Sequence, residues 1–202
     1  DVPGAVAAFE KAAAQNPDQA DYHASLAWAG DLLGDKGERG TELARPHLEQ
    51  AFRVDPGAVK AHEVAGWLAR ETGDVDGAIE HLGQALRQGR PRLELFDAIK
   101  DLLRRQGRHD ELEQHYRRLI FRLREKHPLE TVPLWIDLAY LYHNKLDQPA
   151  NARVALQVAA KLSPDEPRLQ AALDALGSDS GAQWQQVAEG HRQRLRTHPD
   201  DP

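Results

Sequence analysis

Proline residues recur through this chain of 202 residues at nearly constant intervals. Each closes a stretch in which apolar residues such as Leu26, Leu32 and Leu33 recur at helical spacing, and proline cannot continue a helix. The intervals between them are 39, 35, 37, 36 and 35 residues, which leaves room for two helices in each. A period in the mid-thirties with two helices per unit is typical of a helical solenoid. The prolines are Pro17, Pro56, Pro91, Pro128, Pro164 and Pro199.

Strands are not expected, because no run of β-branched or aromatic residues alternates with polar ones. Glycine-containing breaks at Gly34-Asp35, Gly73-Asp74 and Gly107-Arg108 divide the chain into about eleven helices of roughly 11–18 residues. Apolar residues make up 41% and charged residues 29%, which suits a folded chain with a core. No apolar run approaches the roughly 20 residues of a membrane span.

The stretch "GAVAAFEKAAAQNPDQ" illustrates how the units are expected to pack. Ala5, Phe9 and Ala12 lie on one helical stripe, and Pro17 follows. Small residues let two helices approach closely, while the large residue fills the space between them. The same pattern of small and large residues returns along the chain, so each helix pair is expected to bury its apolar face against the next pair.

These units resemble the tetratricopeptide repeat family, whose 34-residue helix–turn–helix carries W-x2-L-G-x2-Y and then A-x3-F with a closing proline. The resemblance covers nearly the whole chain and is weaker in the third and fifth units, where for example Lys100 replaces a small residue. It implies an all-α, right-handed α-solenoid of about five helix–turn–helix units. The fourth unit matches best, with Trp135, Leu138, Ala139 and Tyr142 followed by Ala152, Leu156, Ala159 and Pro164.

We expect one array over residues 1–202, excerpted from a longer protein. Residues 1–17 would form the second helix of a partial unit. The first unit would carry a loop insertion, "GDKGERGTE", and the fifth, in which Trp184 belongs to the second helix, would be degenerate. The five units would span residues 18–56, 57–91, 92–128, 129–164 and 165–202.

Motifs that would carry chemistry are weak. Cysteine is absent, "GSDSG" has Asp179 where a nucleophile elbow needs serine, and His109 and His115 are six residues apart, on different faces of a helix. The glycines of "GDKGERG" have the wrong spacing for a phosphate loop. We therefore expect no catalytic residues, no metal site and no cofactor, and the chain is not expected to be an enzyme.

A binding surface is the stronger expectation. The resemblance implies that first helices line a concave groove, and their register places one row of side chains five residues after His23, His62, Phe96 and Trp135. The residues one helical turn after this row and one helical turn before it form two further rows beside it. The expected groove residues are Trp28, Asp31, Glu63, Trp67, Arg70, Asp97, Asp101, Arg104, Tyr140 and His143.

The tryptophans have two interpretations. Trp28 and Trp67 either anchor a partner in the groove or pack against neighbouring helices, and we favour the groove because exposed tryptophans are common interface anchors. Trp135 matches the packing tryptophan of the family, so we expect it in the core.

Residues 87–126 carry 12 basic and 7 acidic side chains, whereas both flanking segments are acidic and the whole chain has a net charge of −6. This basic stretch is either a solvated helical face, a contact for an acidic protein, or an RNA-binding surface. We favour the solvated face, because glutamates are interspersed and nucleic acid is a poor fit to a chain with so few Ser, Thr and Asn residues.

The sequence therefore predicts a non-catalytic scaffold that binds a protein or peptide in its concave groove. Two alternatives stay open: the regulatory repeat region of a larger enzyme whose catalytic domain lies outside these residues, and an RNA-binding helical repeat. Self-association through the uncapped ends is a further expectation. We expect a cytoplasmic protein, although a cysteine-free chain also suits the periplasm, and the 19 arginines against 7 lysines suggest a bacterial source.

Overall fold

The computed structural model describes residues 2–34 and 37–175. These residues form ten α-helices and one short 3-10 helix, and no strand occurs among them. The all-α fold predicted from the sequence is confirmed. None of the described helices is both long and apolar enough to cross a membrane. The predicted helix that would contain Trp184 lies outside the described residues, as does Pro199.

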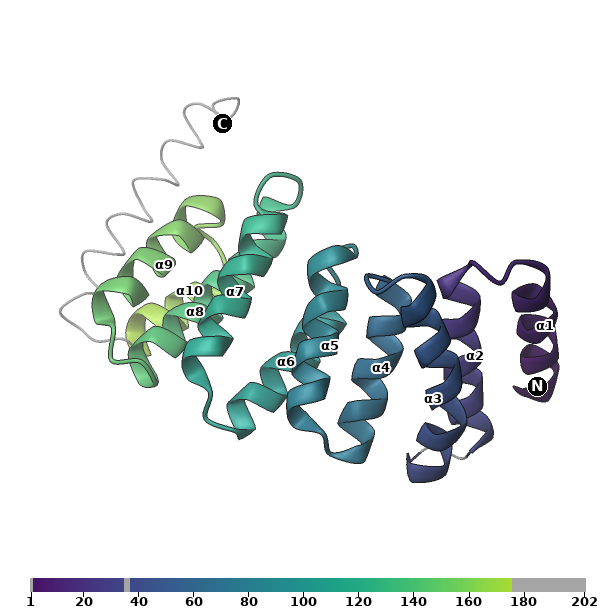
Figure 1. Cartoon of the computed structure of the whole chain (residues 1–202). Helices are drawn as coiled ribbons and strands as arrows, with labels where there is room; N and C mark the ends of the chain where they lie inside the picture. The colour runs from purple at the N-terminus through teal and green to yellow at the C-terminus, as the bar shows by residue number, and fades with distance from the viewer. Residues whose placement is uncertain (1, 35–36, 176–202) are drawn as a thin grey trace. The chain divides into compact units, whose positions relative to one another are not determined.

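The chain divides into two compact units, which are residues 1–106 and residues 107–202. The first unit holds six helices, which Figure 1 draws in purple to blue. Their bounds are α1 Val2–Gln15, α2 Ala20–Leu33, α3 Gly37–Val54, α4 Val59–Thr72, α5 Val75–Gln88 and α6 Leu93–Arg105. The helices α2 and α3 pack as one pair and α4 and α5 as the next, and α2 also contacts α4.

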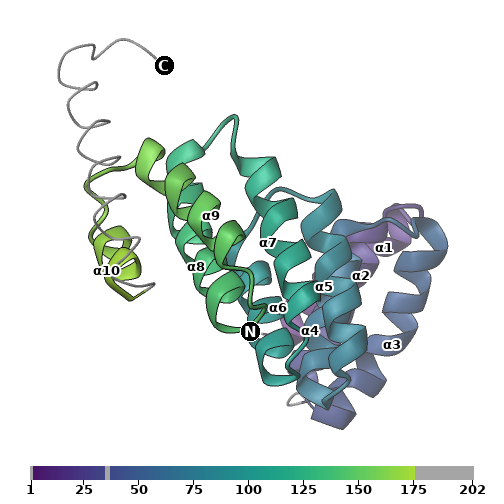
Figure 2. The same ribbon diagram turned by 90° about the vertical axis from the view of Figure 1, so that its left-hand side faces the viewer.

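The second unit, drawn in teal to green, repeats this arrangement. Here α8 and α9 pack as a pair, α7 lies against α8, and α10 contacts both α8 and α9 (Figures 1 and 2). The bounds are α7 His109–Leu123, the 3-10 helix η1 Pro128–Glu130, α8 Thr131–Asn144, α9 Pro149–Leu162 and α10 Pro167–Ala175.

Helix ends follow from local chemistry. Gly73 takes φ of 82°, a left-handed conformation that glycine adopts without strain, and it ends α4. Asp74 then caps α5, because its side chain accepts a hydrogen bond from the backbone N–H of Gly77 at 3.0 Å. Pro149 and Pro167 begin α9 and α10, where a missing N–H costs nothing.

Small residues set the spacing within the helix pairs of the first unit. Gly66 of α4 lies against Leu82 of α5 so closely that an added Cβ would be 2.6 Å from the Leu82 Cγ. Ala44 and Ala51 of α3 are fully buried. The alternation of small and large residues in the sequence therefore corresponds to close helix packing.

The insertion expected to lengthen a loop instead belongs mainly to a helix, because α3 begins at Gly37. This extra helical turn packs on the end of α2: a Cβ on Gly40 would clash with the backbone and carboxylate of Asp31. The absence of a side chain at Gly40 permits this approach. The insertion thus extends the packed surface of the first pair.

Candidate functional site

The expected tryptophan anchors lie on neighbouring first helices of the first unit. Trp28, on α2, leaves 38% of its surface exposed. Trp67, on α4, is half-buried, and the guanidinium of Arg70 lies 5.3 Å from its ring centroid. Because α2 contacts α4, the two helices that carry these indole rings are neighbours in one layer. An indole stacked under an exposed arginine offers a partner apolar area beside a positive charge.

Two acidic residues expected in the groove already have partners. Glu63 accepts hydrogen bonds from the Nη1 of Arg92 to both carboxylate oxygens at 2.7 Å, and Arg92 also bonds Glu94 at 2.8 Å. These hydrogen bonds, donated by Arg92 to Glu94 and to Glu63, raise the pKa of Arg92, the bond to Glu94 having the larger effect. Asp97 accepts a 2.5 Å bond from Lys100. The ion pairs fix their carboxylates on the surface of α4 and α6.

Asp31 departs from the expectation. The register of α2 predicted a groove position, but the side chain is fully buried and lies against Gly40 of α3. The physical reason is the additional helical turn of α3, which covers the end of α2. Asp31 is therefore a residue of the interior and not of the partner-binding surface.

The remaining expected residues are on the surface of their units. Asp101 and Arg104 are exposed on α6 of the first unit. Tyr140 is half-buried and His143 exposed on α8 of the second unit. The structure places Trp28 and Trp67 on contacting helices of one unit, with Arg70 beside Trp67, and a continuous row of groove residues stays a prediction.

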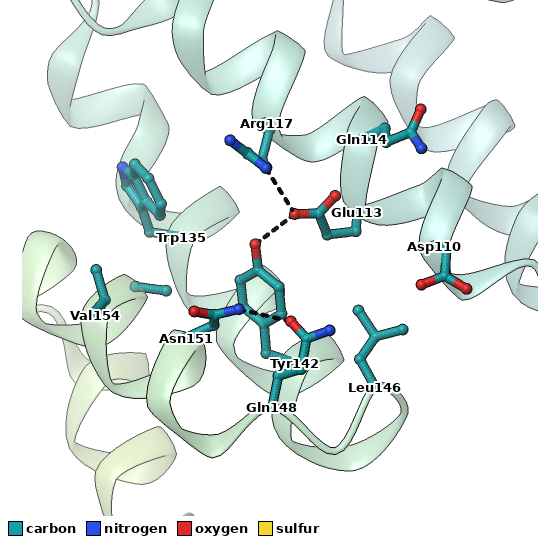
Figure 3. A pocket seen from close by; sticks show the side chains of 11 residues that line it. Asp110, Glu113, Gln114, Arg117, Trp135, Tyr142, Leu146, Gln148, Asn151 and Val154 are labelled. Carbon is teal, nitrogen blue, oxygen red and sulfur yellow. Dashed lines mark hydrogen bonds and ion pairs between the residues drawn. The ribbon is translucent and has the colours of Figure 1, made fainter.

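A pocket that the sequence did not predict lies in the second unit. It has a volume of 460 Å³, and α7, α8 and α9 surround it (Figure 3). Trp135, expected in the core, is half-buried and forms part of its wall. The full lining is Asp110, Glu113, Gln114, Arg117, Trp135, Tyr142, Leu146, Gln148, Asn151, Val154 and Ala155.

A hydrogen-bond network holds one side of this pocket. The hydroxyl of Tyr142 donates to Oε1 of Glu113 at 2.6 Å, and the Nη1 of Arg117 lies 3.4 Å from the same oxygen. Burial, and then the bond to Glu113, raise the pKa of Tyr142, so its phenol stays protonated. Asn151 donates to Gln148 at 2.7 Å at the start of α9, where both residues line the pocket. Figure 3 shows these bonds and the indole of Trp135 on the other side.

One sequence signal could have found this pocket. Asp110, Glu113, Gln114 and Arg117 recur at intervals of three and four residues, so they share one polar stripe on α7. A polar stripe usually indicates a solvated face. Only the packing of α7 beside α8 reveals that this stripe faces an indole and a phenol.

Three aromatic rings fill the interior between α3, α4 and α5 of the first unit. His62 donates through Nε2 to the carbonyl of Pro56 at 3.0 Å, so its Nδ1 accepts from the Nδ1 of His81 at 3.0 Å. Phe52 stacks on His81 with ring centroids 5.7 Å apart. Burial lowers the pKa of His81, and the neighbouring His62 lowers it further. Among the described residues, no group of three His, Asp or Glu side chains is placed to hold a metal ion.

The basic stretch is partly neutralised within its own helices. Arg108 forms two hydrogen bonds with Glu111, at 2.8 and 2.7 Å, and Arg117 pairs with Glu113. The guanidinium of Arg124 lies 4.1 Å from the ring centroid of Phe121, a side chain with 62% of its surface exposed. Carboxylates or an aromatic ring thus lie beside three of these arginines, and the solvated helical face stays a prediction.

Successive helix pairs in each unit define an all-α helical-repeat protein. A profile of the tetratricopeptide repeat family matches residues 37–92, which span α3, α4 and α5. The match to this segment supports the resemblance to the tetratricopeptide repeat family that the sequence pattern predicted. The crystal structure of BtubC from P. vanneervenii is similar, with a TM-score of 0.57, 14% sequence identity, and coverage of 100% of this chain and 92% of that one. This likeness concerns the fold alone. No curated protein matches the sequence.

Proposed function

We propose that this protein is a non-catalytic scaffold that binds a protein or peptide on the first helices of its repeats. Repeats of this family commonly serve protein interaction, and the described surface of the first unit suits that role. The observation that carries the proposal is the pair Trp28 and Trp67 on contacting helices, with Arg70 stacked on Trp67. The partner would place an apolar side chain on the indoles and an acidic group near Arg70.

Energetics support this assignment of roles. Large, rigid aromatic side chains supply much of the binding energy at protein interfaces, whereas charged residues around them set orientation and association rate. Glu63 and Asp97 are held in ion pairs, and Asp101 and Arg104 are exposed on α6. The tryptophans would therefore provide affinity, and Asp101, Arg104 and Arg70 would set the register of the bound segment.

The test is an affinity capture from source-cell lysate read by mass spectrometry, followed by titration of the captured protein in purified form. The native chain is compared with a Trp28→Ala/Trp67→Ala double variant. Loss of two anchor side chains is expected to weaken binding by at least about 30-fold. Phe121→Ala is the matched control, because it removes an exposed aromatic ring from the second unit.

Helicity of all three proteins is compared first by circular dichroism. Support requires one partner that the native chain and the Phe121→Ala control bind equally and the double variant loses. If the double variant retains the partner, or if no chain captures any protein, the tryptophans are structural and the proposal is wrong.

A further inference from the structure

The pocket of the second unit has an excess of negative charge. Two carboxylates, Asp110 and Glu113, and one guanidinium, Arg117, are among its lining groups. Asp110 lies exposed in the first turn of α7, and no ion pair of its carboxylate occurs among the described residues. The pocket therefore favours a cation over an anion, since a desolvated charge needs an opposite partner.

Glu113 is positioned to accept a further hydrogen bond. Its side chain is 16% exposed, and both described bonds reach the same oxygen, Oε1. The Tyr142 hydroxyl holds that oxygen and so orients the carboxylate. Within the described part of the chain, Oε2 has no hydrogen bond, and Figure 3 shows it on the far side of the carboxylate from Tyr142.

Arg117 neutralises this carboxylate weakly. Its side chain is 68% exposed and its Nη1 lies 3.4 Å from Glu113, longer than the roughly 2.7–2.9 Å of a strong charge-assisted hydrogen bond. Exposed pairs of this kind contribute little to stability. A ligand cation that enters the pocket meets a carboxylate whose described cationic partner is one exposed arginine.

The rest of the wall suits a planar cation with a long apolar stem. Trp135 offers an indole face, which attracts a guanidinium through its ring electrons, and Leu146 and Val154 offer apolar contacts. The amide side chains of Gln114 and Gln148 add polar groups to the lining. At 460 Å³ the cavity falls within the range of about 300–1,000 Å³ that ligand pockets occupy.

We propose that this pocket binds an arginine side chain of a partner polypeptide, with Glu113 and Asp110 pairing its guanidinium and Trp135 stacking on it. A guanidinium matches the site better than an ammonium, because its planar fork can bond a carboxylate while its face lies on an aromatic ring. This site lies on the second unit and does not depend on the tryptophans of the first unit.

The probe is N-acetyl-arginine methylamide, titrated into the full 15N-labelled chain. The signal of the Trp135 indole N–H, assigned by its loss in Trp135→Phe, is expected to shift in a saturable manner with a dissociation constant of about millimolar order. The matching citrulline derivative has nearly the same shape without the charge and is expected to bind at least about tenfold more weakly. The corresponding derivative of glutamate tests whether an anion binds instead.

Glu113→Gln is expected to weaken arginine binding about tenfold, because it removes the charge and keeps an acceptor for Tyr142. Glu125→Gln, which removes an exposed charge of the same unit outside the pocket, should leave binding unchanged. Asp110→Asn, at an exposed position, provides a second variant if Glu113→Gln perturbs folding. Trp28→Ala/Trp67→Ala should also retain the arginine response, which separates this site from the proposed partner surface.

Three outcomes would overturn the proposal: no saturable shift with the arginine derivative, an equal shift with the citrulline or glutamate derivative, or unchanged affinity in both carboxylate variants. A shift that depends on the guanidinium and on either carboxylate supports it.

Discussion

The two units place very different side chains at equivalent points of their repeats. His62 of α4 and Trp135 of α8 occupy the same register of a first helix. On the following second helix, the pattern Ala78, Leu82, Ala85 in α5 corresponds to Ala152, Leu156, Ala159 in α9. This places His81 of the first unit opposite Ala155 of the second. The first unit therefore has two histidines at the positions where the second unit has a tryptophan and an alanine.

The consequence of this difference is a filled space in one unit and a pocket in the other. In the first unit, His62 and His81 hydrogen-bond at 3.0 Å, and Phe52 covers them. In the second unit, Trp135 and Ala155 line the 460 Å³ cavity. The half-buried His81 on the second helix thus packs against the first helix in one unit, whereas Ala155 lines a pocket at the equivalent point of the other. The repeat fold is the same in both cases, which shows that a site can arise on it through a few side chains.

The largest effect is expected where the helices of the first unit approach most closely. Gly66→Ala would place a Cβ 2.6 Å from the Cγ of Leu82 and 2.9 Å from its backbone nitrogen. We expect the free energy of unfolding to fall by about 2 kcal/mol, because overpacking outweighs the gain in helix propensity. Urea denaturation followed by circular dichroism measures this change.

The reverse substitution in the second unit provides the control. Ala139 of α8 occupies the register of Gly66 and is fully buried. Ala139→Gly should cost about 1–2 kcal/mol through backbone entropy and the loss of one buried methyl group, without overpacking. An unchanged or increased stability of Gly66→Ala would contradict the close packing of α4 and α5.

A smaller effect is expected from the hydrogen bond that orients the pocket. Tyr142→Phe removes the 2.6 Å bond to Glu113 and should lower the free energy of unfolding by about 1 kcal/mol. It should also weaken arginine binding a few-fold, because Glu113 loses its fixed orientation. Tyr140→Phe is the matched control on the same helix, since its half-buried hydroxyl makes no hydrogen bond among the described residues. If the two variants have the same free energy of unfolding and the same affinity for the arginine derivative, Tyr142 does not position Glu113.

The sequence predicted the helices well, because proline spacing and apolar periodicity are local properties of the chain. Ala44, Leu82 and Leu138, placed in the core by the repeat pattern, are buried. The site was less predictable. Asp31 has the register of a surface residue and is buried only because α3 extends over it. The pocket around Trp135 depends on the distances between three helices, which no local pattern encodes.

The smallest expected effect is a difference between the two units in how the free energy of unfolding depends on pH. Burial, and then His62, lower the pKa of His81 from its ordinary value of 6.5. Above about pH 7 this imidazole is neutral in both the folded and the unfolded chain, so its protonation does not lower the free energy of unfolding. As the pH falls below 6.5, the unfolded chain binds a proton more readily than the folded one, and the free energy of unfolding decreases. The equivalent residue of the second unit, Ala155, does not titrate.

His81→Gln should therefore flatten the dependence of the free energy of unfolding on pH between about 7 and 5. His47 keeps part of the slope, because burial also lowers its pKa. His143→Gln, at an exposed position of α8 in the second unit, is the matched substitution measured beside His81→Gln. Urea denaturation at several pH values measures all three proteins. If His81→Gln and His143→Gln flatten the slope equally, the hydrogen-bonded histidine pair does not give the first unit its own pH response. The two units then differ at this point only in the volume of the side chain opposite the first helix.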